Sequence, residues 1–183
     1  LSGTLLIDRS FEPIRGRVVI EDGQIERIEE TETTSTDIVL PAFVNAHTHL
    51  GDSVAKEAAV GLSLDEAVAP PGSLKHRQLA AADRSDLVSA MRQTLQFMQR
   101  TGTVSCLDFR ESGTNGAGAL REAAAPVSLD PFIFGSGKQS VLNVADGYGA
   151  SGANDDNFTE QLAACRKRDV PFPIPAGEPD ATD

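Results

Sequence analysis

The chain contains little cysteine, lysine or tryptophan, and it lacks the long apolar runs of membrane-spanning proteins. Among its 183 residues there is no tryptophan, and there are only two cysteines and four lysines, against twelve arginines. Cys106 and Cys165 form no disulfide framework and no CxxC pair, so we expect two buried thiols in a reducing cytoplasm. No apolar run approaches the ~20 residues needed to cross a bilayer, and no signal peptide is recognisable.

Positive charge is also scarce. Lysine and arginine total 16 and aspartate and glutamate 27, which gives a net charge of −11 and a pI of about 4.6. This balance argues against nucleic acid or an anionic membrane as a partner. The acidic, lysine-poor composition predicts adaptation to high salt, and an ordinary acidic enzyme is the alternative.

Histidine is rare too, and its placement is informative. Two of the three histidines, His47 and His49, end an apolar segment that runs over residues 38–48. We expect this segment to be a strand that is buried on both faces. Residues i and i+2 of a strand share a face, so the two imidazoles predict half of a site for zinc or a similar divalent ion. The alternative is a pair of surface residues on a strand.

The rest of the sequence alternates predicted strands and helices, which indicates a parallel sheet. An N-terminal strand over 4–8 precedes a hairpin, whose Asp22-Gly23 is the favoured pair for a type I′ turn. Residues 51–77 predict a long loop of the functional or mobile kind. The predicted later elements are strands at 103–109, 131–135, within 140–153 and at 172–176, and helices at 86–100, 116–125 and after Asn157, with Glu160 completing a capping box.

The segment around the histidine pair, P-A-F-V-N-A-H-T-H, resembles the signature of the amidohydrolase superfamily. The N-terminal hairpin is similar to the small β domain of that family. Residues 172–178, F-P-I-P-A-G-E, resemble a later barrel strand that normally reads F-x-I-H-A-G-E. The resemblance implies an α/β fold: a partial (β/α)8 TIM barrel of about five of the eight strands, over 38–183, and part of a composite β-sandwich domain over 1–37.

The length predicts a fragment of a longer protein. A (β/α)8 barrel alone takes ~250 residues, and the chain begins with Leu1 rather than methionine. The exposed strand edges of an incomplete barrel predict self-association, and a homo-oligomer is a further expectation.

The resemblance also implies a site. His47 and His49 would be metal ligands, and Glu178 would be the catalytic acid and base. Zinc is the leading candidate, with iron or manganese as alternatives, and the lack of a lysine on the fourth strand favours a single ion. Pro175 stands where the family has a metal-binding histidine, so either this copy has lost a ligand or the sequence carries a single-base error at that codon.

Weaker candidates surround these residues. Asp52, Arg110 and Glu111 follow strand ends and are candidates for contact with substrate, with helix capping or salt bridges as the alternative. His76 is expected to be solvated.

The implied activity is hydrolysis, by metal-activated water, of C–N bonds other than peptide bonds in a small-molecule substrate. Deamination of an aminated ring, as in the cytosine deaminase and chlorohydrolase branch, is the leading expectation. Ring opening of the imidazolonepropionase or dihydroorotase kind is an alternative. A rival from another class is an inactive or truncated remnant that serves as a binding or assembly subunit.

Overall fold

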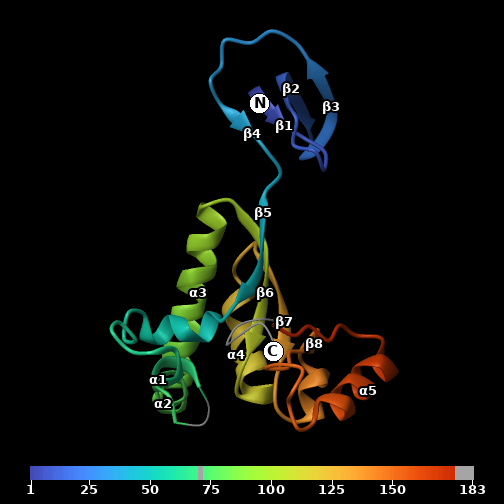
Figure 1. Ribbon diagram of the computed structural model, residues 1–183. Helices are drawn as coiled ribbons and strands as arrows, with labels where there is room; N and C mark the ends of the chain where they lie inside the picture. The colour runs from blue at the N-terminus through green and yellow to red at the C-terminus, as the bar shows by residue number, and fades with distance from the viewer. Residues whose placement is uncertain (70–71, 176–183) are drawn as a thin grey trace. The chain divides into compact units, whose positions relative to one another are not determined.

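The chain folds into two compact units, Leu1–Ala42 and Phe43–Asp183 (Figure 1). The computed structural model describes residues 1–69 and 72–175. Within those residues, none of the helices has the length and apolar character required to span a membrane.

The N-terminal unit is one four-stranded sheet in the order β3-β2-β1-β4. Its strands are β1 (Ser2–Leu6), β2 (Pro13–Glu21), β3 (Gln24–Glu30) and β4 (Ile38–Val39). Asp22 and Gly23, between β2 and β3, both have positive φ, 51° and 76°, so the predicted type I′ turn is confirmed. Leu5 and Val18 are the buried apolar side chains of this sheet.

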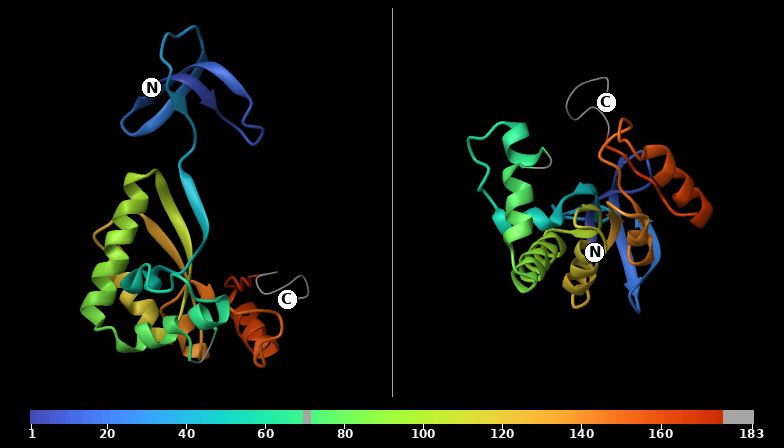
Figure 2. Two further views of the ribbon diagram at one scale, coloured as in Figure 1. Left: turned by 60° about the vertical axis from the view of Figure 1, so that its left-hand side comes forward. Right: turned by 90° about the horizontal axis from the view of Figure 1, so that it is seen from below.

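The second unit contains a parallel sheet whose strands follow chain order, β5-β6-β7-β8. The helices α3 and α4 pack together over one face of it (Figure 2). The predicted alternation of strands and helices is therefore confirmed, with bounds that differ by a few residues. Its principal elements are β5 (Phe43–Thr48), α3 (Arg84–Arg100), β6 (Thr103–Arg110), α4 (Gly113–Ala124), β7 (Asp130–Gly135), η2 (Gln139–Asn143), β8 (Gly147–Tyr148) and α5 (Phe158–Arg168).

The core of this unit lies between the sheet and the two helices. Met91 and Leu95 of α3 are fully buried there, as their helical spacing predicts. Leu120 of α4 and Ile133 of β7 are also fully buried. The opposite face of the sheet carries Phe109 and Phe134, whose ring centroids lie 5.8 Å apart.

The prediction of a single strand over 38–48 is wrong. β4 pairs in parallel with β1 of the first sheet, whereas β5 begins the second sheet by pairing with β6. Pro41 lies between them, and it lacks an N–H and restricts the residue before it, so the ladder breaks there.

The expectation that this strand is buried on both faces is also wrong. Phe43 and Val44 are 55% and 58% exposed. The reason is that β5 is an edge strand of the described sheet, with β6 as its one neighbour there.

Residues 51–77 do not form the expected loop. Outside residues 70 and 71, the segment contains three short helices: η1 (Leu50–Ala55), α1 (Leu64–Val68) and α2 (Leu74–Ala81). Ser63 and Glu66 form a capping box that starts α1. The predicted box at Asn157 is wrong, because the Asn157 side chain caps nothing and Glu160 instead accepts a hydrogen bond from Gln139 Nε2 at 2.9 Å.

The predicted fifth strand forms only half of a ladder. Pro171 and Pro173 carbonyls accept hydrogen bonds from Tyr148 N and Ala150 N of the β8 region, at 3.1 and 3.3 Å. The return donors of a parallel ladder would be the amides of residues 173 and 175, and both are prolines, which have no N–H. The segment is therefore extended without being a regular strand.

Candidate metal centre

A bulge in β5 shapes the backbone at the histidine pair. Asn45 is paired with Cys106 and Thr48 with Asp108, so three steps along β5 match two along β6. The extra residue disrupts the ladder, and the Asn45 side-chain oxygen accepts the His47 N–H at 3.2 Å. Bulges of this kind re-aim side chains near active sites.

The structure brings the two imidazoles together. His47 Nε2 and His49 Nε2 lie 3.1 Å apart, and the His47 ring stacks on Phe109 at a centroid distance of 4.7 Å. Two nitrogen ligands on a tetrahedral zinc lie about 3.3 Å apart, given a zinc–nitrogen distance of about 2.0–2.1 Å. The spacing of the two nitrogens therefore fits a shared ion, and ligation itself stays a prediction.

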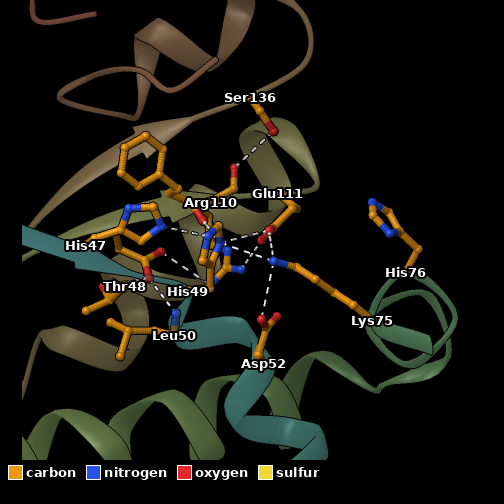
Figure 3. A network of polar contacts seen from close by, with 12 residues as sticks. His47, Thr48, His49, Leu50, Asp52, Lys75, His76, Arg110, Glu111 and Ser136 are labelled. Carbon is orange, nitrogen blue, oxygen red and sulfur yellow. Dashed lines mark hydrogen bonds and ion pairs between the residues drawn. The ribbon is translucent and has the colours of Figure 1, made fainter. Parts of the chain in front are cut away.

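The other nitrogen of His49 defines the state of the ring. His49 Nδ1 lies 3.1 Å from the Phe109 carbonyl oxygen and 3.1 Å from Glu111 Oε1 (Figure 3). A carbonyl and a carboxylate only accept, so these two contacts are hydrogen bonds when Nδ1 carries the hydrogen, and the neutral ring then has a lone pair on Nε2. This is the tautomer that a histidine needs in order to bind a metal through Nε2.

Asp108 contacts the residues on both sides of His49, the backbone amide of Leu50 and the side-chain hydroxyl of Thr48. Its Oδ1 accepts the Leu50 N–H at 2.5 Å and lies 3.2 Å from the Thr48 hydroxyl. The Asp108 side chain is completely buried. Burial raises the pKa of this carboxyl, while the Arg110 guanidinium and the Leu50 amide act in the opposite direction.

Arg110 links two carboxylates beneath the pair. Its guanidinium lies 3.3 Å from Asp108 Oδ2 and also forms an ion pair with Glu111 Oε2. Only 2% of Arg110 is exposed, and a Cβ on Gly51 would collide with the guanidinium. The enclosed position favours the salt-bridge interpretation of Arg110 over contact with substrate.

Lys75 is a member of this network that the sequence did not reveal. Its Nζ lies 2.5 Å from Glu111 Oε1 and 3.3 Å from Asp52 Oδ2, and its side chain is 9% exposed (Figure 3). Burial works to raise the pKa of Glu111, but the hydrogen bond with His49 and the two cations outweigh it, so the pKa lies below its ordinary value. No spacing motif links residues 75 and 111, because only the packing of α2 brings them together.

A shallow hollow of about 570 Å³ opens beside His49 and Asp52, and its other lining residues are Ser53, Ala55, Lys56, Glu57, Ala59 and Val60. His76 lies apart from the pair in Figure 3. It is half-buried, with Nδ1 2.8 Å from Ser73 Oγ, so the expectation of a solvated residue is wrong.

Two predicted positions on the fifth strand add nothing to the described site. Glu178 lies outside the described residues. Pro175 is half-buried, and it has no ligand atom. In the described part of the chain, no group of three or more His, Cys, Asp or Glu side chains could hold a metal ion. A catalytic zinc generally needs three protein ligands, so the pair is at most part of a site.

Comparison with known proteins identifies the family of this chain. The model of the amidohydrolase family matches residues 38–175. A protein of Methanothermobacter thermautotrophicus with the curated name "Putative aminohydrolase" is 34% identical over 186 residues, covering 89% of this chain and 48% of the relative. A protein of Archaeoglobus fulgidus with the same name is 31% identical over 175 residues, covering 92% and 50%. The chain thus spans about half the length of the curated relatives it matches.

The chain also spans about half the length of two solved structures that it resembles. A 5-methylcytosine deaminase from Klebsiella pneumoniae has a TM-score of 0.65 at 12% identity, with 97% of this chain and 50% of that chain covered. Atrazine chlorohydrolase TrzN from Arthrobacter aurescens, complexed with zinc, has a TM-score of 0.65 at 13% identity, with 97% and 52% covered. The shared fold is a partial (β/α)8 barrel with a small N-terminal β portion. The chain belongs to the amidohydrolase family.

Proposed function

We propose that this chain is part of a metal-dependent hydrolase that acts on C–N bonds other than peptide bonds, with deamination of an aminated ring as its reaction. The observation that carries the proposal is the 3.1 Å approach of His47 Nε2 and His49 Nε2, with His49 Nδ1 anchored on two acceptors. Family membership and the names of the deaminase and zinc-containing chlorohydrolase relatives support it. Ring opening remains the alternative reaction.

In this proposal the Nε2 atoms of His47 and His49 hold a divalent ion, zinc first, with iron or manganese as alternatives. Such an ion lowers the pKa of water and polarises the bond to be cleaved. Glu178 is the proposed acid and base. The remaining ligands are proposed to come from a part of the full-length protein that corresponds to the half of the relatives that this chain does not span. A cytoplasmic location and adaptation to high salt remain predictions from composition, and a homo-oligomeric state remains a prediction from the exposed strand edges.

The test uses the full-length gene product. We expect about one zinc per chain by elemental analysis, as for a mononuclear site, and release of ammonia from a panel of aminated pyrimidines and purines. His47→Ala and His49→Ala should lose both the metal and the activity, while the matched control His76→Gln retains them. Stoichiometric metal in both of the first two variants would refute the ligand assignment.

The alternative function is that of an inactive remnant that binds a partner or assembles. Pro175, which replaces a ligand with a residue that can bind no metal, is the observation that favours it. On this alternative the full-length wild type binds zinc weakly and hydrolyses nothing, and Pro175→His raises the zinc affinity. An unchanged affinity in Pro175→His would contradict the assignment of position 175 to a ligand.

A further inference from the structure

The side chains around His49 Nδ1 come from three distant parts of the chain. His49 follows β5, Lys75 lies on α2, and Glu111 follows β6. All three meet at one carboxylate oxygen, Glu111 Oε1, which lies 3.1 Å from His49 Nδ1 and 2.5 Å from Lys75 Nζ. The second oxygen of Glu111 is paired with Arg110, so a different cation holds each oxygen.

Lys75 creates a competition at His49. Its Nζ lies 3.1 Å from His49 Nδ1, within hydrogen-bond distance. An ammonium group can only donate, so it can bond to Nδ1 only when that nitrogen carries no hydrogen. A neutral ring would then carry its hydrogen on Nε2, which faces His47 Nε2 and would have no lone pair for a metal.

We propose that Glu111 is a positioning residue that keeps His49 in the tautomer with the hydrogen on Nδ1, by accepting that hydrogen and by engaging the Lys75 ammonium that would otherwise bond to Nδ1. The total number of protons on the ring is the same in both tautomers, and only their placement changes. The metal part of this inference rests on the proposed function, whereas the tautomer does not. It assigns Glu111 to His49 rather than to the substrate.

The geometry explains why a carboxylate is needed. The neighbours of Glu111 on both oxygens are donors: His49 Nδ1–H and Lys75 on Oε1, and Arg110 on Oε2. Glutamine at this position would present an amide N–H₂ to donors on one side or the other. Where that N–H₂ faces His49, the Phe109 carbonyl is left as the acceptor for His49 Nδ1–H, in competition with Lys75.

The experiment compares Glu111→Gln, Lys75→Met and the double variant in the full-length gene product. The matched controls are Glu122→Gln, in an exposed ion pair with Arg84, and Lys138→Met, at an exposed position. Long-range ¹H–¹⁵N spectra of the metal-free proteins report the tautomer of His49, whose signals are assigned with His49→Gln. Zinc affinity is measured by competition with a chelating indicator.

Glu111→Gln should shift His49 toward the Nε2–H tautomer and raise the zinc Kd by about 10–100-fold, as loss of a partner of a ligating histidine does. Lys75→Met alone should leave the tautomer unchanged. The double variant should regain the Nδ1–H tautomer and part of the zinc affinity, because the competing ammonium is gone. A purely structural role predicts no such recovery.

Two results would overturn the inference: a wild-type tautomer in Glu111→Gln, or a double variant no better than that single variant. If Glu111→Gln does not fold, Glu111→Ala, which removes the carboxylate, replaces it with the same expected direction. If the wild type binds no zinc, the proposed function fails, while the spectra of the metal-free protein still decide the role of Glu111.

Discussion

Replacement of Asp108 by alanine should destabilise the protein strongly. The change leaves the buried Arg110 guanidinium without one of its two carboxylate partners and removes the acceptor of the Leu50 N–H. Breaking a buried ion pair costs about 3–5 kcal/mol, and an orphaned buried donor costs about 1–3 kcal/mol. The two penalties share one site and do not add, so we expect a loss of about 3 kcal/mol or more in the free energy of unfolding.

The loss is measured by thermal unfolding followed by circular dichroism. For a domain of this size each kcal/mol shifts Tm by about 2–4 °C, so Asp108→Ala should lower Tm by about 6–12 °C. Asp108→Asn keeps an acceptor for the Leu50 N–H and should lose less. The control Asp156→Ala changes an exposed residue and should stay within about 0.5 kcal/mol of wild type. An Asp108→Ala protein that melts with the wild type would refute the buried network.

Other expectations follow from the same surroundings. Gly51→Ala should cost about 1–3 kcal/mol, because its Cβ would collide with a buried guanidinium, while Gly72→Ala meets open space and should be neutral in the same melts. Because the folded-state pKa of Glu111 is lowered, its contribution to stability is present above its unfolded pKa of about 4.3 and is lost as pH falls below that value. The difference in free energy of unfolding between wild type and Glu111→Gln, measured by urea denaturation at several pH values, should therefore shrink as the pH is lowered below about 4.3. A difference that grows at low pH would contradict the lowered pKa of Glu111. Burial raises the pKa of the Cys106 thiol to about 11, so alkylation at pH 8 followed by mass spectrometry should find it protected in the folded protein and labelled after unfolding. Rapid labelling of the folded protein would mean that β6 is not covered as described.

Local signals were sufficient for several elements. The Asp22-Gly23 turn and the helix that buries Met91 and Leu95 are both where the sequence predicts them. Each depends on residues close together in the chain: two that accept positive φ, and apolar side chains at helical spacing.

Local signals failed where a distant partner or a missing donor decides the outcome. The fifth strand has the expected apolar composition, but its prolines leave β8 with a one-sided ladder. The predicted capping box at Asn157 was replaced by a bond between Glu160 and Gln139, which lies on another element. The segment 51–77 lacked a clear helical pattern because its helices are short, and neither α1 nor α2 contains a buried residue that would mark an apolar face.

The sequence by itself determined the family and the parallel α/β fold, and it pointed to the pair His47 and His49, because a spacing of two residues on a regular strand would aim two imidazoles one way. Only the tertiary structure decided how that pair is held. The bulge at Asn45, the buried Asp108 and the meeting of Lys75 with Glu111 all depend on contacts between segments that are distant in the chain. Such contacts leave no periodic pattern, since each partner can lie anywhere in the chain that the packing of helices and strands allows.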